Sequence, residues 1–174
     1  MTLVNNEMPS HIRDIKTEYY QAFFGDKWSY YLPVMIDFER GKKFRFNVWA
    51  FFCGIFWQLY RKLYMAMLLF IIVITLELIL KNWTISDWDL DRDTIYFIKL
   101  IETLVFGIIY GYTGNYFLMQ KAQSKIKQVL SSEDDENMIL EKLKKAGSGN
   151  LLGLILLLVF IVGIFALASV QSKV

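Results

Sequence analysis

Three long apolar runs constrain this chain more than any other feature of its sequence. They cover residues 63–80, 96–119 and 151–170, and the third contains no charged residue. A helix that crosses the hydrocarbon core of a bilayer, roughly 30 Å thick, needs about 20 apolar residues. Apolar residues make up 55% of the 174 positions, above the roughly 45–50% of soluble domains. The sequence therefore predicts an all-α, polytopic membrane protein with three transmembrane helices.

Charged residues are rare inside the first two runs. Glu77 is the only one in the first, and Lys99 and Glu102 lie near the start of the second. Because Lys99 and Glu102 are one helical turn apart, they can pair and reach interfacial water. We expect these three residues to form an intramembrane charge cluster toward the outer end of the spans.

The basic residues give the predicted orientation. Nine Lys and Arg precede the first run, two lie in segment 81–95 among four Asp, and six lie in segment 120–150. Loops that stay in the cytoplasm carry an excess of Lys and Arg. Segments 1–47 and 120–150 are therefore predicted to be cytoplasmic, and the acidic loop 81–95 and the tail 171–174 to be external.

Amphipathic helices are expected in both cytoplasmic segments. Ser10 is a candidate N-cap for a helix to residue 24, whose aromatic residues Tyr19, Tyr20 and Phe23 form a candidate partner face. A second helix is predicted to end near Arg40, with Pro33 kinking or splitting it.

The loop 120–150 is also predicted to be helical. Residues 121–130 continue the second run as a helix. Ser132 and Asp135 resemble a capping box for a further helix, and Gly147 ends it.

Residues 48–60 form an uncharged, aromatic-rich stretch that is too short to span a bilayer. Such a stretch beside a true span is typical of an interfacial or re-entrant segment, which we place at 48–62. The alternative is one long tilted helix over residues 48–80. The residues expected at the membrane interface are Trp57, Tyr60, Arg61, Lys62 and Tyr64.

Small residues indicate where helices approach one another. Gly107, Gly111 and Gly114 lie on one side of the second run, in the spacing that lets transmembrane helices pack closely. Packing among the chain's own spans and a dimer seam both fit this pattern. Asn47 can cap the helix that follows it, and Gly54 permits close backbone approach.

Several classes of site are excluded by residue counts. Cys53 is the only cysteine and His11 the only histidine, so one chain cannot form an internal disulfide, a Cys/His zinc site or a Cys/His catalytic pair. The balance of 19 basic and 17 acidic residues does not indicate nucleic-acid binding. Because catalytic motifs are also absent, we expect no enzyme activity, no cofactor, no metal and no small-molecule substrate.

Residues 46–64 resemble the signature of a family of small bacterial inner-membrane proteins of unknown function, Phe-Asn-Trp-x-Ala-Phe-Phe-x-Gly-Pro-Phe-Trp-x-x-Tyr-Arg-Lys-Met-Tyr. The matching residues are Phe46, Asn47, Ala50, Phe51, Phe52, Gly54, Phe56, Trp57, Tyr60, Arg61, Lys62 and Tyr64. Ile55 stands where the family has proline, which favours the continuous-helix alternative. The resemblance implies a fold and a location in the bacterial inner membrane, with no substrate or reaction.

The function expected from these features is that of a small, non-enzymatic membrane protein. It would act by association with a protein partner or with copies of itself, in an adaptor, accessory or immunity-type role. The alternative is an oligomeric pore or transporter component, for example in a defence system.

Overall fold

The structure is a computed structural model that describes the backbone of residues 17–85 and 91–171, and the side chains of residues 17–81 and 91–163. The predicted N-cap at Ser10 lies outside the described residues. All regular structure in the described residues is helical, and three helices are long and apolar enough to cross a membrane. The predictions of an all-α fold and of three apolar helices are thereby confirmed.

The described chain begins with two short helices at nearly the predicted positions. Helix α3 is Thr17–Phe24, the 3-10 turn η1 is Gly25–Lys27, and α4 is Trp28–Glu39. Gly25 has a φ of 55°, which explains why α3 stops there. Pro33 lies inside α4 but does not divide it.

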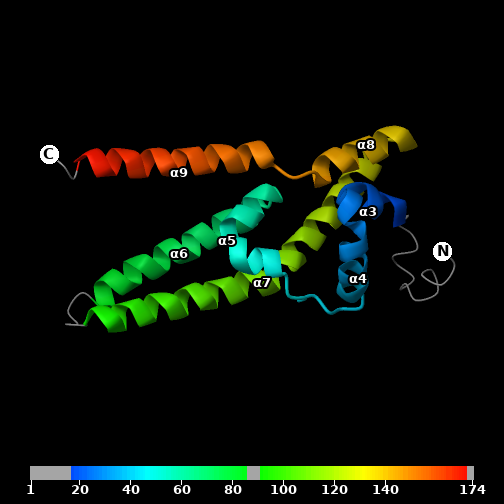
Figure 1. Ribbon diagram of the computed structural model, residues 1–174. Helices are drawn as coiled ribbons and strands as arrows, with labels where there is room; N and C mark the ends of the chain where they lie inside the picture. Colours follow the sequence, from blue (N-terminus) through cyan, green and yellow to red (C-terminus); the bar gives the residue numbers. More distant parts are fainter. Residues whose placement is uncertain (1–16, 86–90, 172–174) are drawn as a thin grey trace.

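The remaining elements are one kinked helix, the three long apolar helices and one short helix. They are α5 (Val48–Tyr60), α6 (Tyr64–Ile85), α7 (Arg92–Leu130), α8 (Glu136–Gly147) and α9 (Leu151–Gln171). Figure 1 shows α6 and α7 as a V that is closed where α6 ends and α7 begins, with α5 filling its open end. Helix α9 runs toward the closed end of the V, apart from both.

Helix α7 has 39 residues and is about 58 Å long at 1.5 Å per residue. It is therefore about twice as long as a bilayer core is thick. Its N-terminal part forms the V with α6. Its C-terminal part packs with α3, α4 and α8 in a compact unit that we call the head.

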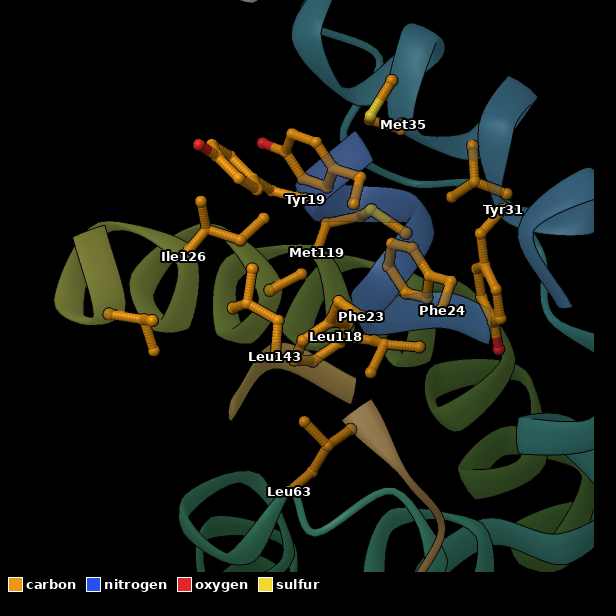
Figure 2. Packing of buried hydrophobic residues seen from close by; sticks show 14 of the residues in the cluster. Tyr19, Phe23, Phe24, Tyr31, Met35, Leu63, Leu118, Met119, Ile126 and Leu143 are labelled. Atoms are coloured by element: carbon orange, nitrogen blue, oxygen red, sulfur yellow. The ribbon is translucent and has the colours of Figure 1, made fainter. Parts of the chain in front are cut away.

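The core of the head is made of aromatic and aliphatic side chains from α3, α4, α7 and α8 (Figure 2). Tyr20 and Phe23 contribute from α3 and are 1% and 2% exposed. Leu143 of α8 and Ile126 of α7 are fully buried. At about 25 cal/mol per Å² of buried apolar surface, this packing is the main source of stability in the head.

This packing corrects one prediction. Tyr19, Tyr20 and Phe23 were expected to form a partner face, but all three are buried against the chain's own helices. The aromatic stripe of α3 is covered because α8 and the C-terminal part of α7 together give it a surface to pack on. These residues are therefore core residues.

The expected capping box before α8 is also not formed. The Asp135 side chain caps α8 itself by accepting from the backbone N–H of Asn137 at 2.9 Å. The Ser132 hydroxyl donates instead to carbonyls of the last turn of α7.

Candidate functional site

The joint between α5 and α7 is held by two buried asparagines, each 1% exposed. The Asn47 side chain caps α5 by accepting from the backbone N–H of Ala50 at 3.0 Å. Its Nδ2 also donates to Oδ1 of Asn115 on α7 at 2.8 Å. Asn115 in turn donates to the carbonyl of Arg45 at 3.2 Å. One buried network thus caps α5 and attaches it to α7.

The three glycines of α7 form the surface on which α5 rests. Gly107 faces Phe51, and Gly111 faces Phe46. At Gly114 a Cβ atom would stand 2.7 Å from the Cβ of Ala50. The glycine stripe is therefore occupied by α5, and the close approach depends on the missing side chains.

Helix α5 is broken at Gly54, where φ is 45° and ψ is −119°. That conformation is in a region that glycine adopts more easily than other residues. Gly54 also faces the ring of Tyr110 on α7. Its two roles, a kink and a close contact, both require the absence of a side chain.

The two arms of α5, before and after Gly54, lie over the same stretch of α7. In chain order the contacts are Asn47 with Gly111, Ala50 with Gly114, Phe51 with Gly107, Gly54 with Tyr110, Trp57 with Gly114 and Arg61 with Lys121. Ala50 and Trp57, one on each side of the break, both face Gly114. The kink at Gly54 therefore folds α5 back over α7.

A Schellman motif separates α5 from α6. The backbone N–H of Leu63 donates to the Gln58 carbonyl at 2.8 Å, and that of Lys62 to the Leu59 carbonyl at 3.0 Å. Lys62 has the left-handed φ of 56° that this motif requires. The alternative of one continuous helix over residues 48–80 is therefore wrong, and Lys62 takes the position that glycine usually occupies.

Polar contacts of Lys62 and Arg61 tie this turn to the head. The Lys62 Nζ donates to the Lys145 carbonyl at 3.1 Å and to the Ser148 hydroxyl at 3.0 Å. The Arg61 carbonyl accepts from Lys121 Nζ at 2.7 Å. The left-handed turn is thus held from two sides.

The Arg61 side chain points into the molecule. It is 6% exposed, and its Nη2 donates to the Tyr31 hydroxyl at 2.7 Å. Its guanidinium carbon lies 5.1 Å from the ring centre of Tyr31 and 5.8 Å from that of Tyr60, within cation–π range. Burial and the Arg61 charge act in opposite directions on the Tyr31 hydroxyl, and burial prevails, so its pKa is raised.

A cavity of about 580 Å³ lies beside Arg61, between η1, α4, α5 and the first turn of α9. We call it the Arg61 cavity. Its lining residues are Asp26, Lys27, Ser29, Tyr30, Tyr31, Trp49, Cys53, Phe56, Trp57, Tyr60, Arg61 and Leu154. The charged residues come from η1 and the end of α5, whereas the rest of α5 and α9 contribute apolar side chains.

The charge cluster expected at the outer ends of the spans has a different composition. Lys81 of α6 pairs with Glu77 at 3.0 Å and also with Glu102 of α7. The expected pairing of Lys99 with Glu102 is therefore wrong. Within the described residues Lys99 takes part in no ion pair. The sequence placed Lys81 in the loop, but α6 continues to Ile85 and brings its amine between the two carboxylates.

The residues predicted for the membrane interface differ in how far they are buried. Trp57 and Arg61 are buried, Tyr60 and Lys62 are half-buried, and Tyr64 is 49% exposed. The Tyr64 hydroxyl accepts from Asn150 at 3.2 Å. In the part of the chain that the structure describes, no group of three His, Cys, Asp or Glu side chains is placed to hold a metal ion.

Sequence reasoning did not single out Tyr31, Tyr110 or Lys81, although each contacts a predicted residue. Tyr31 and Tyr110 lie in helices without a local motif to mark them. Their partners, Arg61 and Gly54, are distant in the sequence. Only Lys81 could have been paired from the sequence, because it lies four residues after Glu77 and so on the same side of the helix.

A family model described as Protein of unknown function (DUF2628) matches residues 34–123. The chain belongs to this family. The region matched in DUF2628 extends from the second half of α4 into the head portion of α7, so it contains the asparagine pair, the glycine stripe and the Schellman turn. The part of the fold that positions α5 on α7 is therefore the part shared with the family. No curated protein and no solved structure matches this chain.

Proposed function

We propose that this protein is a small, non-enzymatic integral membrane protein that acts by association through α9, with a second copy of itself as the occupant. The observation that carries the proposal is the exposure of α9, which packs against the rest of the described chain mainly through α5. Each of its described side chains is at least partly exposed, and none is buried. By contrast, α6 and α7 both bury side chains, including Phe70 and Tyr110, whose rings stack at 4.2 Å.

Gly163 supports a helix partner at this position. A Cβ atom at Gly163 would meet nothing within 4 Å, so a second helix can approach its backbone closely. Val159 lies one turn earlier on the same face and is 64% exposed. Two copies of α9 would cover this face reciprocally, as a two-fold interface requires.

For the membrane placement we propose the bacterial inner membrane, with the head in the cytoplasm and the closed end of the V outside. The excess of Lys and Arg in segments 1–47 and 120–150 supports this orientation. In this orientation α5 is a re-entrant segment, which enters the membrane and leaves it on the same side. The support is its broken helix, in which Ala50 and Trp57, on either side of Gly54, both face Gly114 of α7. A non-helical backbone at membrane depth is tolerated where protein covers it, and Gly54 faces Tyr110.

Disulfide crosslinking tests the association. In a Cys53→Ser background, Val159→Cys should form dimers on oxidation in native membranes. Ile161→Cys, about 200° around the helix, is the matched control and should form few. Adding Gly163→Leu to Val159→Cys should reduce the dimer several-fold. Equal crosslinking at positions 159 and 161, or none at high protein-to-lipid ratio, would contradict the proposal.

The orientation has a separate test with the same Cys53→Ser background. Arg92→Cys should react with a membrane-impermeant maleimide in intact spheroplasts. Asn137→Cys on α8 should react only after the membrane is opened. The reverse pattern would place the head outside and refute the orientation while leaving the α9 interface untouched.

A further inference from the structure

We propose that the Arg61 cavity binds one anionic phospholipid, with the phosphate at Arg61 and Lys27 and the upper part of an acyl chain along Trp49, Cys53 and Leu154. The proposal rests on the placement of the three apolar helices in a membrane. It does not depend on association through α9. Each of the following observations narrows the class of ligand.

The first observation is that the Arg61 charge is buried without a counter-ion among the residues that the structure describes. The side chain is 94% buried, given its 6% exposure. No carboxylate of the described residues lies within the 4.0 Å of an ion pair, and Nε has no hydrogen-bond partner there. Burying a guanidinium with an unpaired N–H costs free energy unless an anion accepts the hydrogen bond and balances the charge. Phosphate oxygens fit the geometry of its donors.

The second observation concerns the remaining charges of the cavity. Lys27 lines it, with Nζ 5.5 Å from the ring centre of Tyr60. Asp26 is the one acid among the lining residues. Two cations and one carboxylate leave an excess of one positive charge. That excess matches the single negative charge of a phosphodiester.

The third observation is the size and chemistry of the wall. A volume of about 580 Å³ is in the range of small-molecule sites. A phosphate ion alone would fill only a small part of it. The lining residues Trp49, Cys53, Phe56 and Leu154 are uncharged and largely apolar. The ligand must therefore be amphiphilic.

The fourth observation is the direction of the cavity. Arg61 contacts α7 at Lys121, whereas Gly54, next to Cys53, contacts α7 at Tyr110. Eleven helical residues separate those two α7 positions, about 16 Å along its axis. The charged end of the cavity thus lies toward the head and the apolar end toward the closed end of the V. A phospholipid in the adjoining leaflet has the same polarity.

Cys53 provides the test, because it is the only cysteine, lines the cavity and is exposed. The rate of its alkylation by N-ethylmaleimide is measured on the full-length protein in dodecylmaltoside. Dioleoylphosphatidylglycerol should slow the reaction at least fivefold. An equal mole fraction of dioleoylphosphatidylcholine, and inorganic phosphate alone, should leave the rate nearly unchanged.

Lys27→Gln and Arg61→Gln should each remove most of the protection by phosphatidylglycerol. Lys43→Gln removes a basic residue that does not line the cavity and should retain it. If Arg61→Gln does not fold, the result for Lys27→Gln tests the proposal by itself. Lys27 is exposed, so its replacement should not disturb folding. Equal protection by both lipids, protection by phosphate alone, or full protection in Lys27→Gln would each overturn the proposal.

Discussion

Asn47 and Asn115 are 68 positions apart in sequence and share a buried amide–amide hydrogen bond of 2.8 Å. Asn47 uses its oxygen for the α5 cap and its nitrogen for α7, whereas Asn115 uses its nitrogen for the Arg45 carbonyl. The two amides therefore connect three parts of the joint, which are the first turn of α5, the segment before it and α7. Local helix capping and long-range packing cannot be separated at this joint.

Replacing Asn115 with Leu should destabilise the joint by about 1–3 kcal/mol, because the buried Asn47 amide would lose its acceptor and the Arg45 carbonyl its donor. The measurement is thermal unfolding in dodecylmaltoside followed by circular dichroism. Gln120→Leu is the control, since Gln120 is exposed and its hydrogen bond to Tyr116 lies within α7. Equal unfolding midpoints for the two variants would contradict a structural role for the pair.

Gly114→Ala should lower stability by roughly 1–3 kcal/mol, the range for overpacking a buried contact. Its Cβ would be 2.7 Å from that of Ala50 and 3.2 Å from the Trp57 ring, so α5 would have to move away from α7. Ser124→Ala is the control, because Ser124 is an exposed residue of the same helix. If both changes have the same effect on the unfolding midpoint, α5 does not rest on the glycine stripe.

Glu102→Gln should weaken the connection between α6 and α7 by about 1 kcal/mol, the upper range for partly exposed ion pairs. It leaves Lys81 with Glu77 on its own helix as the remaining carboxylate. Lys99→Gln, which disturbs no ion pair of the described residues, should have a smaller effect on the unfolding midpoint. A larger effect for Lys99→Gln would show that the pairing was assigned to the wrong lysine.

The stability of the head should fall with rising pH between about 10 and 12 because of Tyr20. Burial, with a smaller contribution from the Glu39 carboxylate, raises the pKa of Tyr20 to about 12, against a hydrogen bond with Gln123 that lowers it. Above pH 10 the unfolded chain loses this proton while the folded chain keeps it, so unfolding is favoured.

Near pH 12 the Tyr20 contribution is roughly 2 kcal/mol. Tyr20→Phe should therefore lose less stability than the parent between pH 9 and 12, measured by urea unfolding at each pH. Tyr30→Phe serves as the control, as Tyr30 is 46% exposed. Parallel pH profiles for the parent and Tyr20→Phe would rule out this titration.

Features that depend on local sequence were predictable. Each apolar helix is continuous in hydropathy, Asn47 precedes a helix that it caps, and the Gly107, Gly111 and Gly114 spacing marks a contact face. The identity of the contact was not predictable, because the same glycine pattern suits a neighbouring span or a second chain. In the structure the occupant is α5, an element too short to be counted as a span.

The failures have a common cause, which is competition between distant contacts and local preference. Lys62 adopts a left-handed conformation without being glycine, since its amine is held by the Lys145 carbonyl and Ser148. Gly54 breaks α5 although the proline of the family signature is replaced by Ile55. Tyr19, Tyr20 and Phe23 have the pattern of an exposed amphipathic helix, yet α7 and α8 cover them. No local pattern contains this information.

The unbroken course of α7 has a mechanical consequence. Its 39 residues form one continuous helix, so the backbone that lies beside α6 passes into the head without a loop. A displacement of its apolar half is therefore carried through helical backbone to the part that contacts α3 and α8.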